Sequence, residues 1–261
     1  RGAIAPGYRG DVVLLDDLKD FHVNRVFVEG TLVAEEGKYL PEIKKCDISS
    51  VKGSVIVKDF SKEKFKMNLK SNKVNVIKIL PGGVVTAKDT AEIELDANGE
   101  FVRNPEVDLV KVAVVERHQG TGNVACGFLK GYGIKEGAVA LSVAHDSHNI
   151  IVVGVNDEEM EFAVNSLIEQ EGGIVLVKEG KVIESMPMPI AGLMSDQSGE
   201  WVDQKLTDIH EKAYEELGIC GDVEPVMTLC FMSLAVIPEI KLTDMGLFDV
   251  TTFSFIPVEV E

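Results

Sequence analysis

The sequence predicts an α+β protein in which a mixed-sheet domain with two main helices follows a partial β-sandwich segment. Three apolar runs, 112–115, 138–144 and 150–155, are rich in Val and Ile and do not alternate with polar residues. Such runs are typical of strands buried on both faces of a sheet. Two other stretches, 156–172 and 200–217, place apolar residues at helical spacing. Because hairpins are interspersed with only these two helices, an α+β fold is favoured over a doubly wound one.

Further strands are predicted on both sides of a lysine-rich stretch, 58–73. The stretch is interrupted by acids and by Phe60, Phe65 and Met67, and we expect it to be a solvated linker face. The first 40 residues predict strands too short to form a core of their own. In chain order, strands are expected at 11–15, 23–29, 32–34 and 74–80, at 84–86 and 91–95 after a turn at Pro81-Gly82-Gly83, and in a hairpin of 174–178 with 181–185.

The two helices have recognisable ends. Asn156 fits the N-cap of the first, with Glu159 as its reciprocal partner three residues on, and Gly172-Gly173 ends that helix. Gly218 ends the second. The apolar run 226–237 is too short to span a bilayer, so it predicts a buried helix or a strand pair that closes the core.

Composition excludes several classes of function. The chain has 261 residues and a formal net charge of −17, without a basic run, which argues against binding to nucleic acid or to an anionic membrane. Neither a membrane span nor a signal peptide is recognisable. The four cysteines are widely spaced, and reduced thiols in a cytoplasmic protein are the simplest explanation. The chain begins at Arg1 in what resembles the middle of a loop, so we expect a fragment of a longer protein.

The highest density of reactive side chains follows the central apolar runs. Because the ends of buried strands meet at the rim of a sheet, we expect two polar clusters to meet there. Asp146 could orient an imidazole or raise its pKa, and Glu116 could do the same from the other cluster. The candidate residues are Glu116, His118, His145, Asp146, His148 and Asn149.

Three roles are open for these residues. His145 and His148 have the right ligand type for a divalent metal, although the spacing is no metal signature by itself. The residues could instead line a pocket. They could also form an internal hydrogen-bond network, because buried polar groups must find partners.

Several long strings resemble the bacterial and archaeal adenine deaminases of the amidohydrolase superfamily, in that family's order. These strings are GxIxPGYRGDVVLLD, ERHQGTGN, GFLKGYGIKEGA, SVAHDSHNIIVVG, PIAGLMSD and VIPEIKLTDMGLFDV. The resemblance implies a cytoplasmic enzyme of purine salvage and adenine catabolism that hydrolyses adenine to hypoxanthine and ammonia. It also implies a divalent metal, manganese or iron, that activates water inside an amidohydrolase barrel.

The resemblance further implies a division of the chain and a missing partner. Residues 1–40 would be the closing strands of the amidohydrolase β-sandwich, 41–85 a connecting segment with strands, and 86–261 the adenine deaminase C-terminal domain. The sequence has no His-x-His pair, so no barrel ligand can be carried onto it. We therefore expect the barrel to be absent, this fragment to be inactive by itself, and the candidate residues to face the barrel mouth.

Two alternatives to a part in catalysis stay open. The chain could be a structural or oligomerisation domain, and we expect a homo-oligomer in any case. It could also be an independent small-molecule binding module that uses the His145/His148 cluster.

Overall fold

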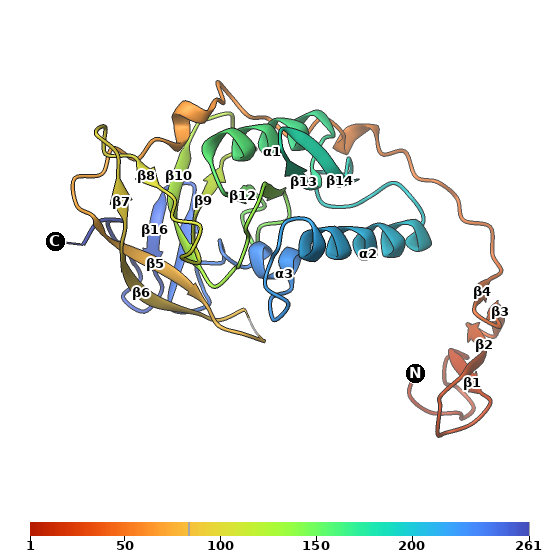
Figure 1. Cartoon of the computed structure of the whole chain (residues 1–261). Helices are drawn as coiled ribbons and strands as arrows, with labels where there is room; N and C mark the ends of the chain where they lie inside the picture. The colour runs from red at the N-terminus through yellow and green to blue at the C-terminus, as the bar shows by residue number, and fades with distance from the viewer. Residues whose placement is uncertain (83, 261) are drawn as a thin grey trace. The chain divides into compact units, whose positions relative to one another are not determined.

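The computed structural model describes residues 1–82 and 84–260 and consists of two compact units, Arg1–Asp47 and Ile48–Glu261 (Figure 1). Gly83, the last residue of the predicted turn after the strand at 74–80, lies outside the described residues. No helix in the described part of the chain has both the length and the apolar character to cross a bilayer.

The first unit is a four-stranded antiparallel sheet in the order β1-β2-β3-β4. The three strands predicted there are confirmed to within one residue, and β4 was not predicted. Glu29 and Gly30 both have positive φ, 52° and 78°, as the tight turn between β2 and β3 requires. Val13, Val23 and Val28 stay exposed. The strands are β1 (Val12–Leu15), β2 (Val23–Val28), β3 (Thr31–Glu35) and β4 (Lys38–Tyr39).

The second unit is built on an eight-stranded sheet in the order β14-β13-β11-β12-β9-β10-β5-β6. Only the β10–β5 pair is parallel, so the sheet is mixed and the predicted α+β class is confirmed. The strands are β5 (Lys73–Ile79), β6 (Thr86–Glu92), β9 (Leu109–Val115), β10 (Val124–Lys130), β11 (Ala138–Leu141), β12 (Ile150–Gly154), β13 (Gly173–Lys178) and β14 (Lys181–Pro187).

Helices cover both faces of this sheet (Figure 1). Along β9, Ala113 and Val115 pack with α1, whereas Val112 and Val114 pack with α2 and α3. Strands β9, β11 and β12 are buried at every residue, which confirms that the apolar runs are two-faced core strands. The helices are η1 (Ser49–Val51), η2 (Lys62–Phe65), α1 (Asp157–Glu169), α2 (Gly199–Glu215) and α3 (Pro225–Cys230).

The remaining strands form two small sheets, and two predictions are corrected here. The expected strand pair at 84–86 and 91–95 is wrong, because β6 is one strand that pairs with β5. Strand β10 was missed because glycines interrupt its apolar pattern. A Cβ at Gly127 would lie 3.5 Å from the Leu242 side chain, an ordinary van der Waals distance, so β15 packs against β10 at this position. The small sheets contain β7 (Glu94–Leu95) with β8 (Phe101–Val102), and β15 (Ile240–Thr243), β16 (Gly246–Asp249) and β17 (Ser254–Phe255).

Asn156 caps α1, as predicted. Its Oδ1 accepts a hydrogen bond of 2.8 Å from the Glu159 main-chain N–H. The predicted reciprocal bond is wrong, because the Glu159 carboxylate instead accepts from the N–H of Gly180 in the β13–β14 turn at 3.1 Å. The acid therefore ties the helix to the sheet.

Replacing Asn156 with alanine should lower the free energy of unfolding by about 1 kcal/mol, because one N–H of the first helical turn loses its acceptor. Urea unfolding followed by circular dichroism measures the loss. Asn165→Ala is the matched control, since Asn165 lies exposed within the same helix. An equal loss in both variants would contradict a capping role.

Candidate functional site

The two polar clusters lie together at the ends of neighbouring strands. Strands β9 and β12 are antiparallel, and Val115 pairs with Ile150. The residues that follow β9 therefore lie beside those that precede β12. The Arg117 main-chain N–H donates to Asn149 Oδ1 at 3.4 Å, and His118 Nε2 lies 2.8 Å from the Ser147 carbonyl oxygen. The predicted meeting of the two clusters is confirmed.

Three imidazoles, those of His118, His145 and His148, form what we call the histidine cluster. The ring centres of His145 and His148 lie 5.7 Å apart, edge to face. The ring of His145 also packs on Phe231 at 4.8 Å, and its main-chain N–H donates to the Cys230 carbonyl at 2.8 Å. The carboxyl end of α3 thus supports the loop that carries the two histidines.

His148 is the most enclosed of the three imidazoles. Burial lowers the pKa of its ring, and the nearby His145 and Arg117 lower it further. Asp146 acts in the opposite direction but is the weaker influence, since its side chain is 83% exposed and its charge is largely screened by water. Asp146 therefore raises the pKa of His148, as expected, but burial and the neighbouring cations outweigh it and the net shift is downward. The neutral form of this ring is therefore favoured.

The Glu116 carboxylate forms hydrogen bonds with the main chain rather than with an imidazole. Its carboxylate accepts from the main-chain N–H groups of His118, Gln119 and Thr121 and from the Thr121 hydroxyl. Burial raises the pKa of Glu116, but these hydrogen bonds outweigh burial and bring the pKa down to about 2. The expectation that Glu116 would orient an imidazole directly is wrong. The carboxylate instead shapes the loop that carries His118.

Replacing Glu116 with glutamine should lower the free energy of unfolding by about 2 kcal/mol at pH 7, because charge-assisted hydrogen bonds to the loop after β9 are lost. The folded pKa of about 2 lies below the ordinary value of 4.5. The contribution of Glu116 is therefore complete above pH 4.5 and is lost as the pH falls toward 2. Urea unfolding at pH 7 and pH 3 should show a smaller difference between wild type and variant at pH 3. Equal differences at both values would contradict this role.

Asn149 joins the histidine cluster to a third loop. It is buried, and its Nδ2 donates to Asp244 Oδ1 at 3.2 Å. Asp244 lies in the turn between β15 and β16. The sequence contains no signal for this contact, since the two residues are 95 positions apart.

Sequence reasoning also missed Arg117, the largest of the fully buried side chains. Its guanidinium donates to the main-chain carbonyl oxygens of His148, Ala191 and Ser142. Burial lowers the pKa of Arg117, and only Glu116 opposes this. The available signal was an arginine two residues after the apolar run 112–115.

The histidine cluster does not fit a metal ion. Among residues 1–82 and 84–260, no group of three or more His, Cys, Asp or Glu side chains is arranged to hold one. The Arg117 guanidinium donates to the main-chain carbonyl of His148 and is near enough to lower the pKa of its ring, and a nearby cation opposes binding of another. His145 and His148, the weak candidates for metal ligands, are better suited to hydrogen bonding.

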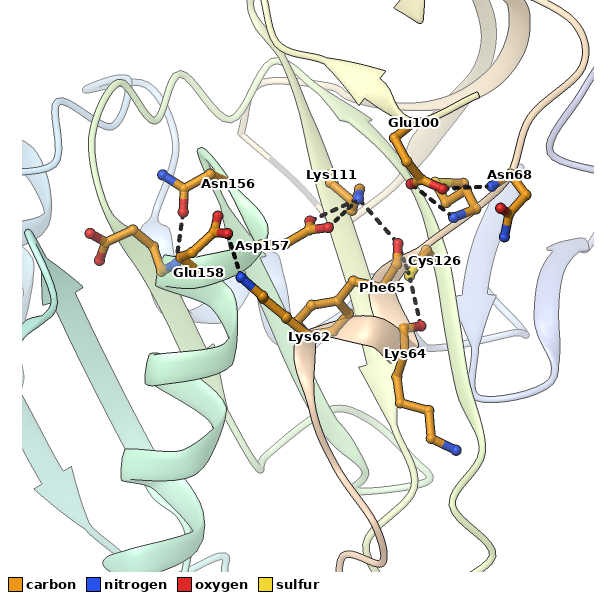
Figure 2. Close-up of polar contacts among 12 residues, drawn as sticks. Lys62, Lys64, Phe65, Asn68, Glu100, Lys111, Cys126, Asn156, Asp157 and Glu158 are labelled. Carbon is orange, nitrogen blue, oxygen red and sulfur yellow. Dashed lines mark hydrogen bonds and ion pairs between the residues drawn. The ribbon is translucent and has the colours of Figure 1, made fainter. Parts of the chain in front are cut away.

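A second charged cluster lies in the same unit, around Lys111 of β9 (Figure 2). The Lys111 Nζ donates to both Asp157 carboxylate oxygens, at 2.8 and 3.0 Å, and to the Phe65 carbonyl at 3.1 Å. All three of its N–H groups are thereby used. Lys62 pairs with Glu158 on the same helix terminus at 2.8 Å.

These contacts fasten residues 60–69, which we call the strap, to the sheet and to α1. Phe65 is completely buried and packs on Phe60 with ring centres 5.4 Å apart. The expected solvated linker face is therefore wrong for this part of the lysine-rich stretch. Because lysines surround Phe65 in the sequence, the pattern did not indicate that this side chain is buried.

The comparisons with known proteins place the chain in a family. The family model described as the adenine deaminase C-terminal domain matches residues 83–254. This match covers most of the second compact unit. The chain belongs to the adenine deaminase C-terminal domain family, so the resemblance found in the sequence is confirmed.

Three curated relatives match almost the whole chain. Adenine deaminase 2 of Desulfotalea psychrophila is 65% identical over 259 residues, which cover 99% of this chain and 45% of that protein. The adenine deaminase of Ligilactobacillus salivarius is 47% identical over 261 residues, covering 100% of this chain and 45% of the relative. Adenine deaminase 2 of Carboxydothermus hydrogenoformans is 46% identical over 257 residues, which cover 98% of this chain and 45% of that protein. The chain therefore spans about half the length of the curated relatives it matches.

Proposed function

We propose that the whole protein to which this chain belongs is an adenine deaminase that hydrolyses adenine to hypoxanthine and ammonia. The observation that carries the proposal is the 65% identity to a protein named adenine deaminase 2. A divalent metal, manganese or iron, would activate the attacking water. Since the described residues offer no metal site, the metal would be held by an amidohydrolase barrel outside this sequence. The enzyme would act in cytoplasmic purine salvage as a homo-oligomer.

We also propose a structural role in that enzyme for each segment of the chain. Residues 1–40 would close the β-sandwich of the amidohydrolase fold, 41–85 would connect, and 86–261 would form the C-terminal domain. The exposed apolar side chains Val13, Val23 and Val28 on the β1–β4 sheet support a missing partner sheet, because isolated apolar strands gain stability only by being covered.

The histidine cluster would face the mouth of the barrel and shape the adenine pocket. Long apolar side chains lie beside it and stay more than half exposed: Ile56, Met194 and Met245. Ile56 donates its main-chain N–H to the Arg117 carbonyl, and Met245 follows Asp244 directly. A polar centre with an apolar border is the composition expected of a surface that another part of the enzyme covers. The neutral His148 ring can donate and accept hydrogen bonds there.

The experiment that tests this role is the double replacement His145→Ala and His148→Ala in the whole enzyme. Turnover of adenine should fall by on the order of 10- to 100-fold, because misplacing a substrate costs that much in rate. Metal content should not change. His210→Ala is the matched control, since His210 lies in the same unit but pairs with Glu224 at 2.5 Å.

Two experimental outcomes would support a different function for the histidine cluster. Unchanged turnover and metal content in the double variant would make the cluster an internal network of a structural or oligomerisation domain. Adenine-dependent ammonia release by the 261-residue chain with manganese or iron added would show that this chain carries the active site itself. The proposal expects no release and no bound metal from the chain alone.

A further inference from the structure

We propose that Arg117 is the positioning residue of the histidine cluster. Its guanidinium holds the main chain of residues 142–149 against residues 191–192, and this sets the geometry of His145 and His148. The relevance of that geometry to adenine hydrolysis rests on the proposed function. The positioning role itself is a property of this chain.

The first argument is the choice of partners for a buried cation. Arg117 is 1% exposed, and a cation is costly to bury unless it is well hydrogen-bonded or paired. Within residues 1–82 and 84–260, this guanidinium donates to main-chain carbonyls and to no carboxylate. Its Nε donates to the His148 carbonyl, and Nη2 to those of Ala191 at 3.2 Å and Ser142 at 3.5 Å. Nη1 is buried and has no hydrogen-bond partner among the described atoms. A buried arginine bonded in this way adds little to the free energy of unfolding. Its role is to hold together the two loops that it joins.

The second argument is the fit of the planar guanidinium. A Cβ added to Gly192 would lie 2.7 Å from Nη1 and 2.9 Å from Cζ, and Gly192 has a φ of +71°. The glycine therefore lies directly against the guanidinium. The Ser142 hydroxyl donates to the Gly192 carbonyl at 2.5 Å. Both loops are thus joined twice, once through Ser142 and once through Arg117. A lysine lacks the planar fork and could not make the Nε bond to His148 together with the Nη2 bonds to Ala191 and Ser142.

The third argument is the conformation of His148 itself. This residue has a φ of 53°, in the left-handed region that costs free energy for a residue with a side chain. The conformation persists only if the surroundings enforce it. The Arg117 Nε bond to the His148 carbonyl and the His148 N–H bond to the Ala144 carbonyl act on both sides of this residue. Loss of the hydrogen bond from Arg117 Nε should let the His148 ring move away from the His145 ring.

The test is proton NMR of the histidine rings in the 261-residue chain, with His145→Ala and His148→Ala used for assignment. In Arg117→Met the contact between the rings of His145 and His148 should be lost, and the pKa of His148 should rise because a neighbouring cation is gone. In Arg117→Lys the charge remains but the ring contact should still be lost. The charged groups around His148 are His145, Arg117, Asp146 and His118, and all but Arg117 are kept.

The matched control is the double variant Lys111→Met with Asp157→Asn. It removes another buried cation from strand β9, together with its partner on α1, without touching the cluster. The ring contact and the His148 titration should stay as in the wild type. Retention of the ring contact in folded Arg117→Lys and Arg117→Met, or its loss in the control as well, would overturn the proposal. If Arg117→Met does not fold, Arg117→Lys decides alone.

The same variants in the whole enzyme separate the two proposals. If both hold, Arg117→Lys should lower kcat for adenine by on the order of 10-fold with unchanged metal content. If the ring contact is lost but turnover is unchanged, Arg117 positions the rings and the assignment of the cluster to the adenine pocket fails. If the ring contact is kept, the positioning role fails whatever the activity.

Discussion

Replacing Lys111 with methionine is expected to lower the free energy of unfolding by about 3 kcal/mol at pH 7. The Lys111 side chain is 7% exposed, and its partner Asp157 is 27% exposed. Removing one member of a largely buried ion pair leaves the other charge without compensation. The Phe65 carbonyl also loses its donor (Figure 2). Urea unfolding of the chain at pH 7 measures the difference.

The pH dependence of this variant has a definite sign. Burial raises the pKa of Asp157, and Lys111 opposes that rise in the wild type. Without Lys111 the folded pKa lies further above the unfolded value. The folded state then binds more protons than the unfolded state in this range, so stability falls as the pH rises through it. The deficit of Lys111→Met should therefore be larger at pH 7 than at pH 4.

Two controls make the result specific. Lys62→Met removes an exposed lysine that pairs with Glu158 on the same helix terminus, and it should cost less than about 1 kcal/mol. The double variant Lys111→Met with Asp157→Asn should recover much of the loss, because no buried charge then remains unpaired. A single variant that loses no more than Lys62→Met would contradict the role of Lys111 as the anchor of the strap.

Local patterns predicted the fold where burial is uniform along an element. Strands β9, β11 and β12 are buried at every residue, and Lys111 is the one charged residue that interrupts their apolar runs. Strand β10 and the strap were misjudged for one shared reason. Gly127 and Phe65 each contact a segment distant in the sequence, the Leu242 side chain in one case and the sheet under α1 in the other.

The candidate site was predictable only in part. That residues 116–118 and 145–149 would meet follows from strand ends, because neighbouring core strands share a rim. The hydrogen-bond partners of the individual side chains could not be predicted from the strand ends. Arg117 reaches Ala191, and Asn149 reaches Asp244, through contacts between loops far apart in the chain. Glu116 has partners close in sequence, yet their N–H groups became available only because the loop after β9 turns around its carboxylate.

Lys241 provides the opposite case, a buried cation whose removal should stabilise the protein. Its side chain is completely buried in β15, and its Nζ donates to the Val84 carbonyl at 3.0 Å. Burial lowers the pKa of Lys241 to about 8 from the ordinary 10.5. Since a tenfold change in proton affinity corresponds to about 1.4 kcal/mol, the protonated form costs the folded state about 3 kcal/mol at pH 7. Lys241→Met, which loses one hydrogen bond of about 1 kcal/mol, should raise the free energy of unfolding by about 2 kcal/mol.

The sign of the pH effect distinguishes this explanation from better packing alone. Between pH 8 and pH 10.5 the unfolded lysine is protonated and the folded one is not, so wild-type stability should rise with pH across that range. In Lys241→Met this rise should be absent, and the advantage of the variant should shrink from pH 7 to pH 10. Lys181→Met, at an exposed lysine of β14, should change stability by less than about 0.5 kcal/mol at either pH. A constant advantage of Lys241→Met at pH 7, 9 and 10 would mean that methionine packs better and that the buried charge costs the fold little.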